Sequence, residues 1–239
     1  MLDDMTREEV VAVLDTLVDQ LLGEAGVSGP PVDAISLAQK HLGMTIVMDR
    51  NQADRGRAQR TGGRQRIYLR PEPLEERHQW TVAHEIGQHL KDEIQSQLSI
   101  DEEQAKTLMG ESLNTLFCSR LLVPFMWFRD DAKALDYSLP DLKKKYSTAS
   151  NEVIALRMLD LPFPTIITVV DNEEISRRKS NGPKFKETEL EDIEQRCQNR
   201  VRQTGEANTI NEGHWTVQGW PLHKPDWKRE ILRTVVEES

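Results

Sequence analysis

Residues 79–90 form the segment that most constrains how this chain folds. Their sequence, Gln-Trp-Thr-Val-Ala-His-Glu-Ile-Gly-Gln-His-Leu, nearly matches the pattern His-Glu-x-x-His. In that pattern, two histidines four residues apart lie on one face of an α-helix and can hold one metal ion. Here the residue four after His84 is Gln88, and the next histidine, His89, lies about 140° around a helix from His84. We therefore predict a helix that presents His84 and Gln88 together and leaves His89 away from them, as a surface or a packing residue.

Glu85 follows His84 and occupies the position of the general base in this pattern. A zinc ion lowers the pKa of a bound water toward about 7, and a neighbouring carboxylate can then accept its proton. Gln88 offers a neutral amide oxygen, which is a weaker zinc ligand than imidazole. The third ligand of such a site comes from a following helix, where the candidates are Asp101, Glu102, Glu103 and Glu111. Glu111 is preferred, because the leucines around it predict a packed helix in which a carboxylate should face a positive group.

The composition is typical of a protein that works in water. Of 239 residues, 37% are hydrophobic and 30% are charged, and no apolar run approaches the roughly 20 residues that a membrane span needs. The acidic start of the chain does not resemble a signal peptide, so we expect a cytoplasmic protein without membrane contacts. A net charge of -9 argues against direct nucleic-acid binding. We expect the basic cluster Arg177-Arg178-Lys179, which acidic residues follow, to form a solvated turn.

Apolar spacing and capping residues predict the secondary structure. Helices are predicted over residues 6–22, 34–41, 74–90, 101–121, 139–146, 150–158 and 188–201. Strands are predicted over residues 44–48, 66–69, 165–170 and 210–218, with strand or helix over 227–236. Residues 49–65 suit a hairpin or a flexible connection, and residues 91–99 suit a polar break. The sequence therefore predicts an α+β fold, with a mainly helical domain and a small β-sheet over residues 1–162, followed by a small α/β region over residues 163–239.

Several blocks within residues 31–158 resemble the ImmA/IrrE family of zinc-dependent peptidases, the DUF955 group. The first block runs from Pro31-Val32-Asp33 to Leu42-Gly43-Met44 and matches the entry helix and strand of the family. The second is Arg77-x-x-Trp80-Thr81-Val82-Ala83-His84-Glu85-Ile86-Gly87. The third is Glu111-x-x-Asn114-x-x-Phe117-x-x-x-Leu121-Leu122-x-Pro124, and a weaker fourth runs from Asp141 to Arg157. The resemblance implies a zincin-like metallopeptidase fold for residues 1–162.

Carried over residue by residue, the resemblance implies that His84 and Glu111 are zinc ligands and that Glu85 is the base. Gln88 stands where the family has its second histidine ligand. The implied activity is that of a zinc-dependent metallo-endopeptidase that cleaves a protein. The substrate implied by the family is a helix-turn-helix transcriptional repressor.

Gln88 motivates a second hypothesis, because a missing ligand commonly removes most of the activity of a metal site. Under this hypothesis the chain is a catalytically impaired or inactive member of the family that acts as a regulatory protein-binding module. The group that would stabilise a developing oxyanion is not identified by any motif, and Tyr137 and Tyr146 are the candidates.

Overall fold

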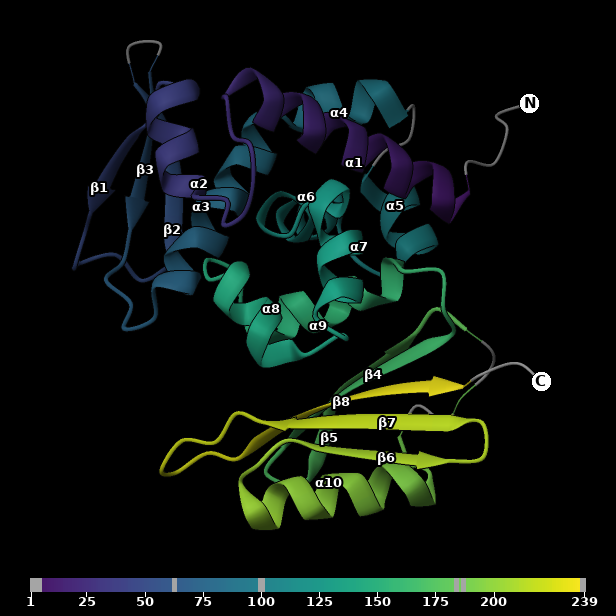
Figure 1. Ribbon diagram of the computed structural model, residues 1–239. Coiled ribbons are helices and arrows are strands. Elements are labelled where there is room, and N and C mark those ends of the chain that lie inside the picture. Colours follow the sequence, from purple (N-terminus) through teal and green to yellow (C-terminus); the bar gives the residue numbers. More distant parts are fainter. Residues whose placement is uncertain (1–5, 62–63, 99–101, 183–184, 186–187, 237–239) are drawn as a thin grey trace. The chain divides into compact units, whose positions relative to one another are not determined.

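The computed structural model describes residues 6–61, 64–98, 102–182, 185 and 188–236 and divides into two compact units (Figure 1). Unit 1 consists of Met1–Lys133 and Lys143–Ser150, and unit 2 consists of Ala134–Leu142 and Asn151–Ser239. The boundary predicted at residue 162 falls inside unit 2. The segment before that residue, α9 (Asn151–Arg157) and the 3-10 turn η2 (Met158–Asp160), packs against β4 of unit 2.

Unit 1 contains a three-stranded sheet with the strand order β1-β3-β2. β1 (Thr45–Met48) pairs in parallel with β3 (Arg64–Leu69), and β2 (Gly56–Thr61) pairs with β3 as an antiparallel hairpin. A hairpin is one of the two alternatives predicted for residues 49–65. Helix α3 (Glu75–His89) packs against β2 and β3 (Figure 1). A Cβ atom on Gly56 would lie 2.1 Å from the Thr81 side chain of α3, so the close approach of strand and helix requires glycine there.

The centre of unit 1 is α6 (Leu113–Leu122), most of whose residues are buried. α1 (Arg7–Glu24) and α3 both pack against α6. α1 begins with the predicted capping box, in which the side chains of Thr6 and Glu9 accept hydrogen bonds from each other's backbone N–H groups. The second predicted helix is present as two short consecutive elements, α2 (Ala34–Ser36) and the π-helical η1 (Leu37–His41).

The prediction of a polar break after the motif is wrong. Residues 91–98 form a helix, α4 (Lys91–Leu98). Ile94 and Leu98, four residues apart, are both buried on the side of α4 that packs against α1. Burial of these two side chains stabilises a helix whose remaining residues are polar, and this stabilisation depends on a segment far away in the sequence.

The prediction of one helix over residues 101–121 is also wrong, because two helices occupy this segment. α5 (Glu102–Met109) ends at Gly110, whose φ of +71° is a left-handed conformation that terminates a helix. Ser112 then caps α6, because its hydroxyl accepts a hydrogen bond from the backbone N–H of Thr115. Asp101, predicted as the cap of the single helix, lies outside the described residues.

Unit 2 is built on a five-stranded antiparallel sheet with the strand order β5-β4-β8-β7-β6 (Figure 1). Its strands are β4 (Thr165–Asp171), β5 (Glu174–Ser180), β6 (Asn208–Glu212), β7 (Trp215–Pro221) and β8 (Arg229–Val236). Helix α10 (Asp192–Thr204) packs against β6, β7 and β8. The core between this helix and the sheet consists of Ile193, Cys197, Val201, Val217 and Leu232.

Two predictions in unit 2 need correction. The basic cluster Arg177-Arg178-Lys179 lies within β5 and not in a solvated turn. Arg178 is buried there, because its guanidinium pairs with the Glu194 carboxylate of α10. The single strand predicted over residues 210–218 is two strands, β6 and β7, joined by a turn in which Gly213 has a φ of +58°. Residues 229–236, left open between strand and helix, form β8.

Two further helices, α7 (Phe125–Ala134) and α8 (Leu139–Lys145), join the segments of the two units along the chain. The protein is therefore a mixed α+β protein with small sheets, as the sequence predicts. Within the described ranges, no helix is both long and apolar enough to cross a membrane.

Candidate functional site on helix α3

Helix α3 forms where the motif predicts it, and one face of the helix is buried. Val82, Ala83 and Ile86 are fully buried, and Gly87 lies against α6. A Cβ atom on Gly87 would lie 2.0 Å from Oδ1 of Asn114 and 3.0 Å from Phe117. A glycine at this position therefore allows α3 to lie in close contact with α6.

His84 and Glu85 lie next to each other at the border between the buried and the exposed face of α3. His84 is half-buried and Glu85 is buried. Burial lowers the pKa of His84 and raises the pKa of Glu85, so desolvation favours the neutral form of both groups. Burial, and in addition the nearby Glu85 carboxylate, raises the pKa of the Cys118 thiol on α6. Glu85 is therefore a carboxyl group with an increased proton affinity beside a neutral imidazole.

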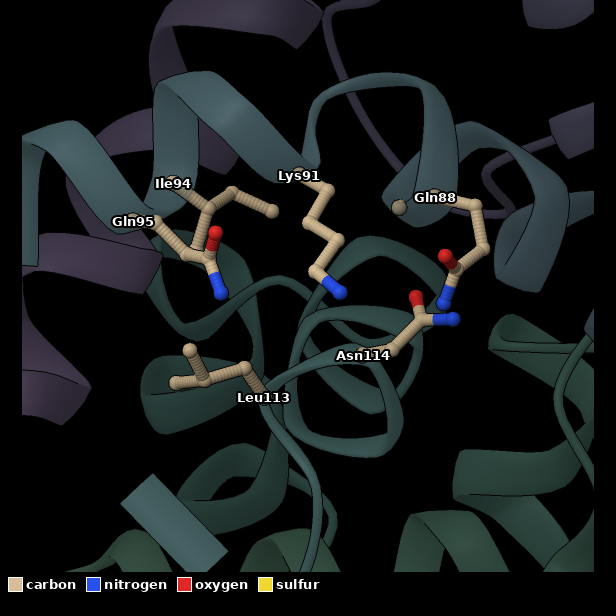
Figure 2. Close-up of a pocket in the computed structure, with 7 residues that line it drawn as sticks. Gln88, Lys91, Ile94, Gln95, Leu113 and Asn114 are labelled. Carbon is tan, nitrogen blue, oxygen red and sulfur yellow. The ribbon is translucent and has the colours of Figure 1, made fainter. Parts of the chain in front are cut away.

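Gln88 is exposed and lines a shallow pocket between α3, α4 and α6 (Figure 2). The pocket is lined by Gly87, Gln88, Lys91, Ile94, Gln95, Leu113 and Asn114. Figure 2 shows the amide groups of Gln88 and Asn114 pointing toward one another and the Lys91 ammonium group directed into the same space. The Asn114 amide also donates a hydrogen bond of 3.2 Å to the backbone carbonyl of His84, which ties the pocket to the motif. Lys91, Gln95 and Asn114 belong to a site that sequence reasoning did not identify.

Glu111, the preferred third ligand, does not lie within a helix. It is half-buried in the short connection between α5 and α6, directly after the left-handed Gly110. The residue of this segment that faces α3 is Asn114, the second residue of α6. Among the other candidates, Glu103 is exposed, the Glu102 side chain is not described, and Asp101 lies outside the described residues. His89 is exposed at the end of α3, which is the surface alternative of the two predicted for it.

The described donor groups near α3 differ from the usual ligands of a zinc ion. Zinc in proteins is held by imidazole, thiolate and carboxylate groups. Within the part of the chain that the structure describes, no three His, Cys, Asp or Glu side chains come together as a group that could hold a metal ion. His84 contributes an imidazole, whereas Gln88 contributes a neutral amide that is a weak zinc ligand. The site is better described as an amide-lined pocket beside a protonatable pair, His84 and Glu85.

The two tyrosines considered as oxyanion stabilisers have other roles. Tyr146 is fully buried, and its hydroxyl donates a hydrogen bond of 2.7 Å to Oδ2 of Asp131. Tyr137 belongs to unit 2, where the Arg233 guanidinium lies 3.9 Å from the centre of its ring. Tyr146 is therefore a core residue, and Tyr137 belongs to a different unit from α3.

Comparison with known proteins shows the fold alone. No model of a protein family matches this chain, and no curated protein matches it. The solved structure of a Mycobacterium tuberculosis transcriptional regulator is similar to this chain with a TM-score of 0.66 and 15% sequence identity. The similarity covers 96% of this chain and 80% of that one, so it includes the folds of both units.

Proposed function

We propose that this chain is a regulatory protein with a zincin-like domain that binds a protein partner at the amide-lined pocket. The observation that carries the proposal is Gln88, which is exposed on the pocket wall at the position of the second histidine ligand. The proposal corresponds to an impaired or inactive member of the ImmA/IrrE family. The partner that this resemblance suggests is a helix-turn-helix repressor, and the name of the structural neighbour, a transcriptional regulator, supports a role in transcription.

The chemistry of the pocket suits a peptide segment. Each amide side chain offers donors and an acceptor, which matches the N–H and C=O groups of a peptide backbone. Gln88, Gln95 and Asn114 provide three such amides, and Lys91 adds an ammonium donor for a carbonyl or carboxylate. Ile94 and Leu113 add an apolar wall for a side chain. The pocket is small, so the contacts made here position a partner and the remaining affinity comes from the surrounding surface.

Photo-crosslinking tests this proposal. A photoreactive amino acid placed at Gln88 should capture one defined protein in the native host, whereas the same amino acid at the exposed Gln195 of α10 should not. Capture should persist in the presence of a chelator and in the Glu85→Gln variant, because binding needs neither metal nor a base. Loss of capture with the chelator, while the chain stays folded, would contradict the proposal.

The second candidate function is the zinc-dependent metallo-endopeptidase itself. The observation that favours it is Glu85, a buried carboxyl group with a raised pKa beside His84, because catalytic bases commonly have perturbed pKa values. Here the expected zinc ligands are His84, Glu111 and Gln88. Under the regulatory proposal, the purified chain retains less than one equivalent of zinc after saturation and dialysis, and Gln88→His raises its zinc affinity. The matched control is Gln195→His. One equivalent of zinc in the unaltered chain, together with repressor cleavage that Glu85→Gln abolishes, would establish the peptidase instead.

A further inference from the structure

The β2–β3 hairpin of unit 1 and the residues beside it are rich in arginine, although the net charge of the complete chain is negative. Residues 49–70 contain seven arginines and two aspartates, a formal charge of +5, whereas the complete chain carries -9. No lysine occurs in this segment. The prediction against nucleic-acid binding rests on the charge of the whole chain. At physiological salt the Debye length is about 8 Å, so distant acidic groups have little effect on the potential at the hairpin.

The register of the sheet separates the hairpin side chains onto two faces. Ala58 pairs with Ile67, and Ile67 is fully buried, so these residues lie on the face covered by α3. Neighbouring residues of a strand point to opposite faces, which places Arg57 and Arg66 on the other face. Both arginines are exposed. The outer face of the sheet therefore presents guanidinium groups from two adjacent strands.

The end of the hairpin is a two-stranded ribbon. β1 pairs with β3 only from Arg66 to Leu69, so the cross-strand pairs Arg60–Gln65 and Thr61–Arg64 extend beyond β1. Arg60 lies two residues after Ala58, so it points to the opposite face from Arg57 and Arg66, and it is exposed where the ribbon extends beyond β1. A ribbon of two strands is narrow enough to enter the major groove of duplex DNA, which is about 12 Å wide.

Three arginines of the hairpin have no carboxylate partner among the described residues. Arg70, at the base of the hairpin, pairs with Glu72 at 2.8 Å. Within the described ranges, Arg57, Arg60 and Arg66 have no ion pair, and Arg57 lies 5.2 Å from the centre of the Tyr68 ring. The guanidinium group binds phosphate with two parallel hydrogen bonds, which makes arginine the residue suited to phosphodiesters. Three exposed guanidinium groups are thus available to a polyanion.

We propose that the β2–β3 hairpin binds the phosphodiester backbone of duplex DNA through Arg57, Arg60 and Arg66. A single strand is a poorer fit, because proteins bind single strands by stacking bases on exposed aromatic rings. Tyr68 is the aromatic residue of the hairpin, it is half-buried, and the Arg57 guanidinium lies over its ring. The hairpin is distinct from the amide-lined pocket, so this inference does not depend on the proposed function.

Fluorescence anisotropy of the full chain with a labelled duplex of about 20 base pairs tests the proposal. Three phosphate contacts predict a slope of log K against log salt of about −2.7, or roughly 40-fold weaker binding when salt rises from about 50 to about 200 mM. A single strand of the same length should bind more weakly than the duplex. No binding at about 100 μM protein and about 50 mM salt, or tighter binding of the single strand, would overturn the proposal.

Variants that change the charge of the hairpin test whether it is the DNA-binding surface. The double variant Arg57→Glu/Arg66→Glu should bind the duplex about tenfold or more weakly than the unaltered chain. The neutral double variant Arg57→Gln/Arg66→Gln should lose a smaller part of this affinity. The matched control, Arg7→Glu/Arg200→Glu, makes the same charge change at exposed positions of α1 and α10 and should bind within about twofold of the unaltered chain. Circular dichroism of each variant verifies folding. If the control loses as much affinity as the hairpin variant, or if the folded neutral variant binds like the unaltered chain, the hairpin is not the binding surface.

Discussion

Replacing Glu194 by Gln should strongly destabilise unit 2. Glu194 and Arg178 have side-chain exposures of 0% and 1% and form a two-bonded ion pair with distances of 2.8 and 3.1 Å. Thr234 donates a further hydrogen bond of 2.6 Å to the same carboxylate, and the backbone N–H of Glu191 donates one of 2.9 Å. The carboxylate therefore connects β5, β8 and the start of α10. Its charge compensates the positive charge of Arg178.

The expected magnitude follows from the burial of the pair. Removing one partner of a buried ion pair costs about 3–5 kcal/mol, because the remaining charge stays buried without compensation. Glutamine keeps the shape and one acceptor oxygen, so Glu194→Gln should lie near the lower value, about 3 kcal/mol. With a urea dependence of about 1–3 kcal/mol/M, the unfolding midpoint of unit 2 should fall by roughly 1–3 M.

Urea unfolding followed by tryptophan fluorescence measures this change, since Trp220 is buried in unit 2. Glu206→Gln, the same change at an exposed position, is the control and should shift the free energy of unfolding by less than about 0.5 kcal/mol. The double variant Arg178→Met/Glu194→Met removes both charges and should be more stable than Glu194→Gln. A cost below about 1 kcal/mol for Glu194→Gln, or a double variant less stable than Glu194→Gln, would refute the reasoning.

Three further predictions concern unit 1 and the core of unit 2. Hydrogen bonds from Arg70 and then Arg77 hold the pKa of Glu72 at about 2, below its ordinary value of 4.5. This interaction stabilises the fold above pH 4.5 and is lost as pH falls toward 2, so Glu72→Gln should reduce the acid dependence of the melting temperature. Gly219→Ala should cost about 1–3 kcal/mol in urea unfolding, because its Cβ would lie 2.8 Å from a side chain of α10. Gly110→Ala should lower the melting temperature through a cost of about 1–2 kcal/mol, since alanine is strained at a φ of +71°.

Elements specified by local signals were predictable from sequence. α1 has a capping box and a continuous apolar stripe, and α3 has the motif and its helical spacing. These signals act within a few residues, so they survive in any tertiary context. Consequently the placement of His84 and Glu85 on one helix, with His89 turned away from His84, followed from the sequence.

Elements stabilised from a distance were not predictable in the same way. The buried side chains of α4 gain their stabilisation from α1, about 80 residues earlier in the chain, and a local count of polar residues cannot include that contact. The strand β5 looked like a solvated turn because its basic residues were considered without Glu194. Because Gly110 ends α5 in a left-handed conformation, Glu111 lies in a connection and not in the predicted helix. Asn114 is the residue that contacts α3.

The sequence by itself determined that α3 exists, that His84 and Glu85 are neighbours on it, and that Gln88 follows His84 by four residues. The reason is that helical periodicity and residue identity are local properties. Only the tertiary structure decided how deeply each side chain is buried, which pKa is raised or lowered, and that Asn114 and Lys91 share a pocket with Gln88. Burial and pairing depend on segments that folding brings together, and those segments are separate in the sequence.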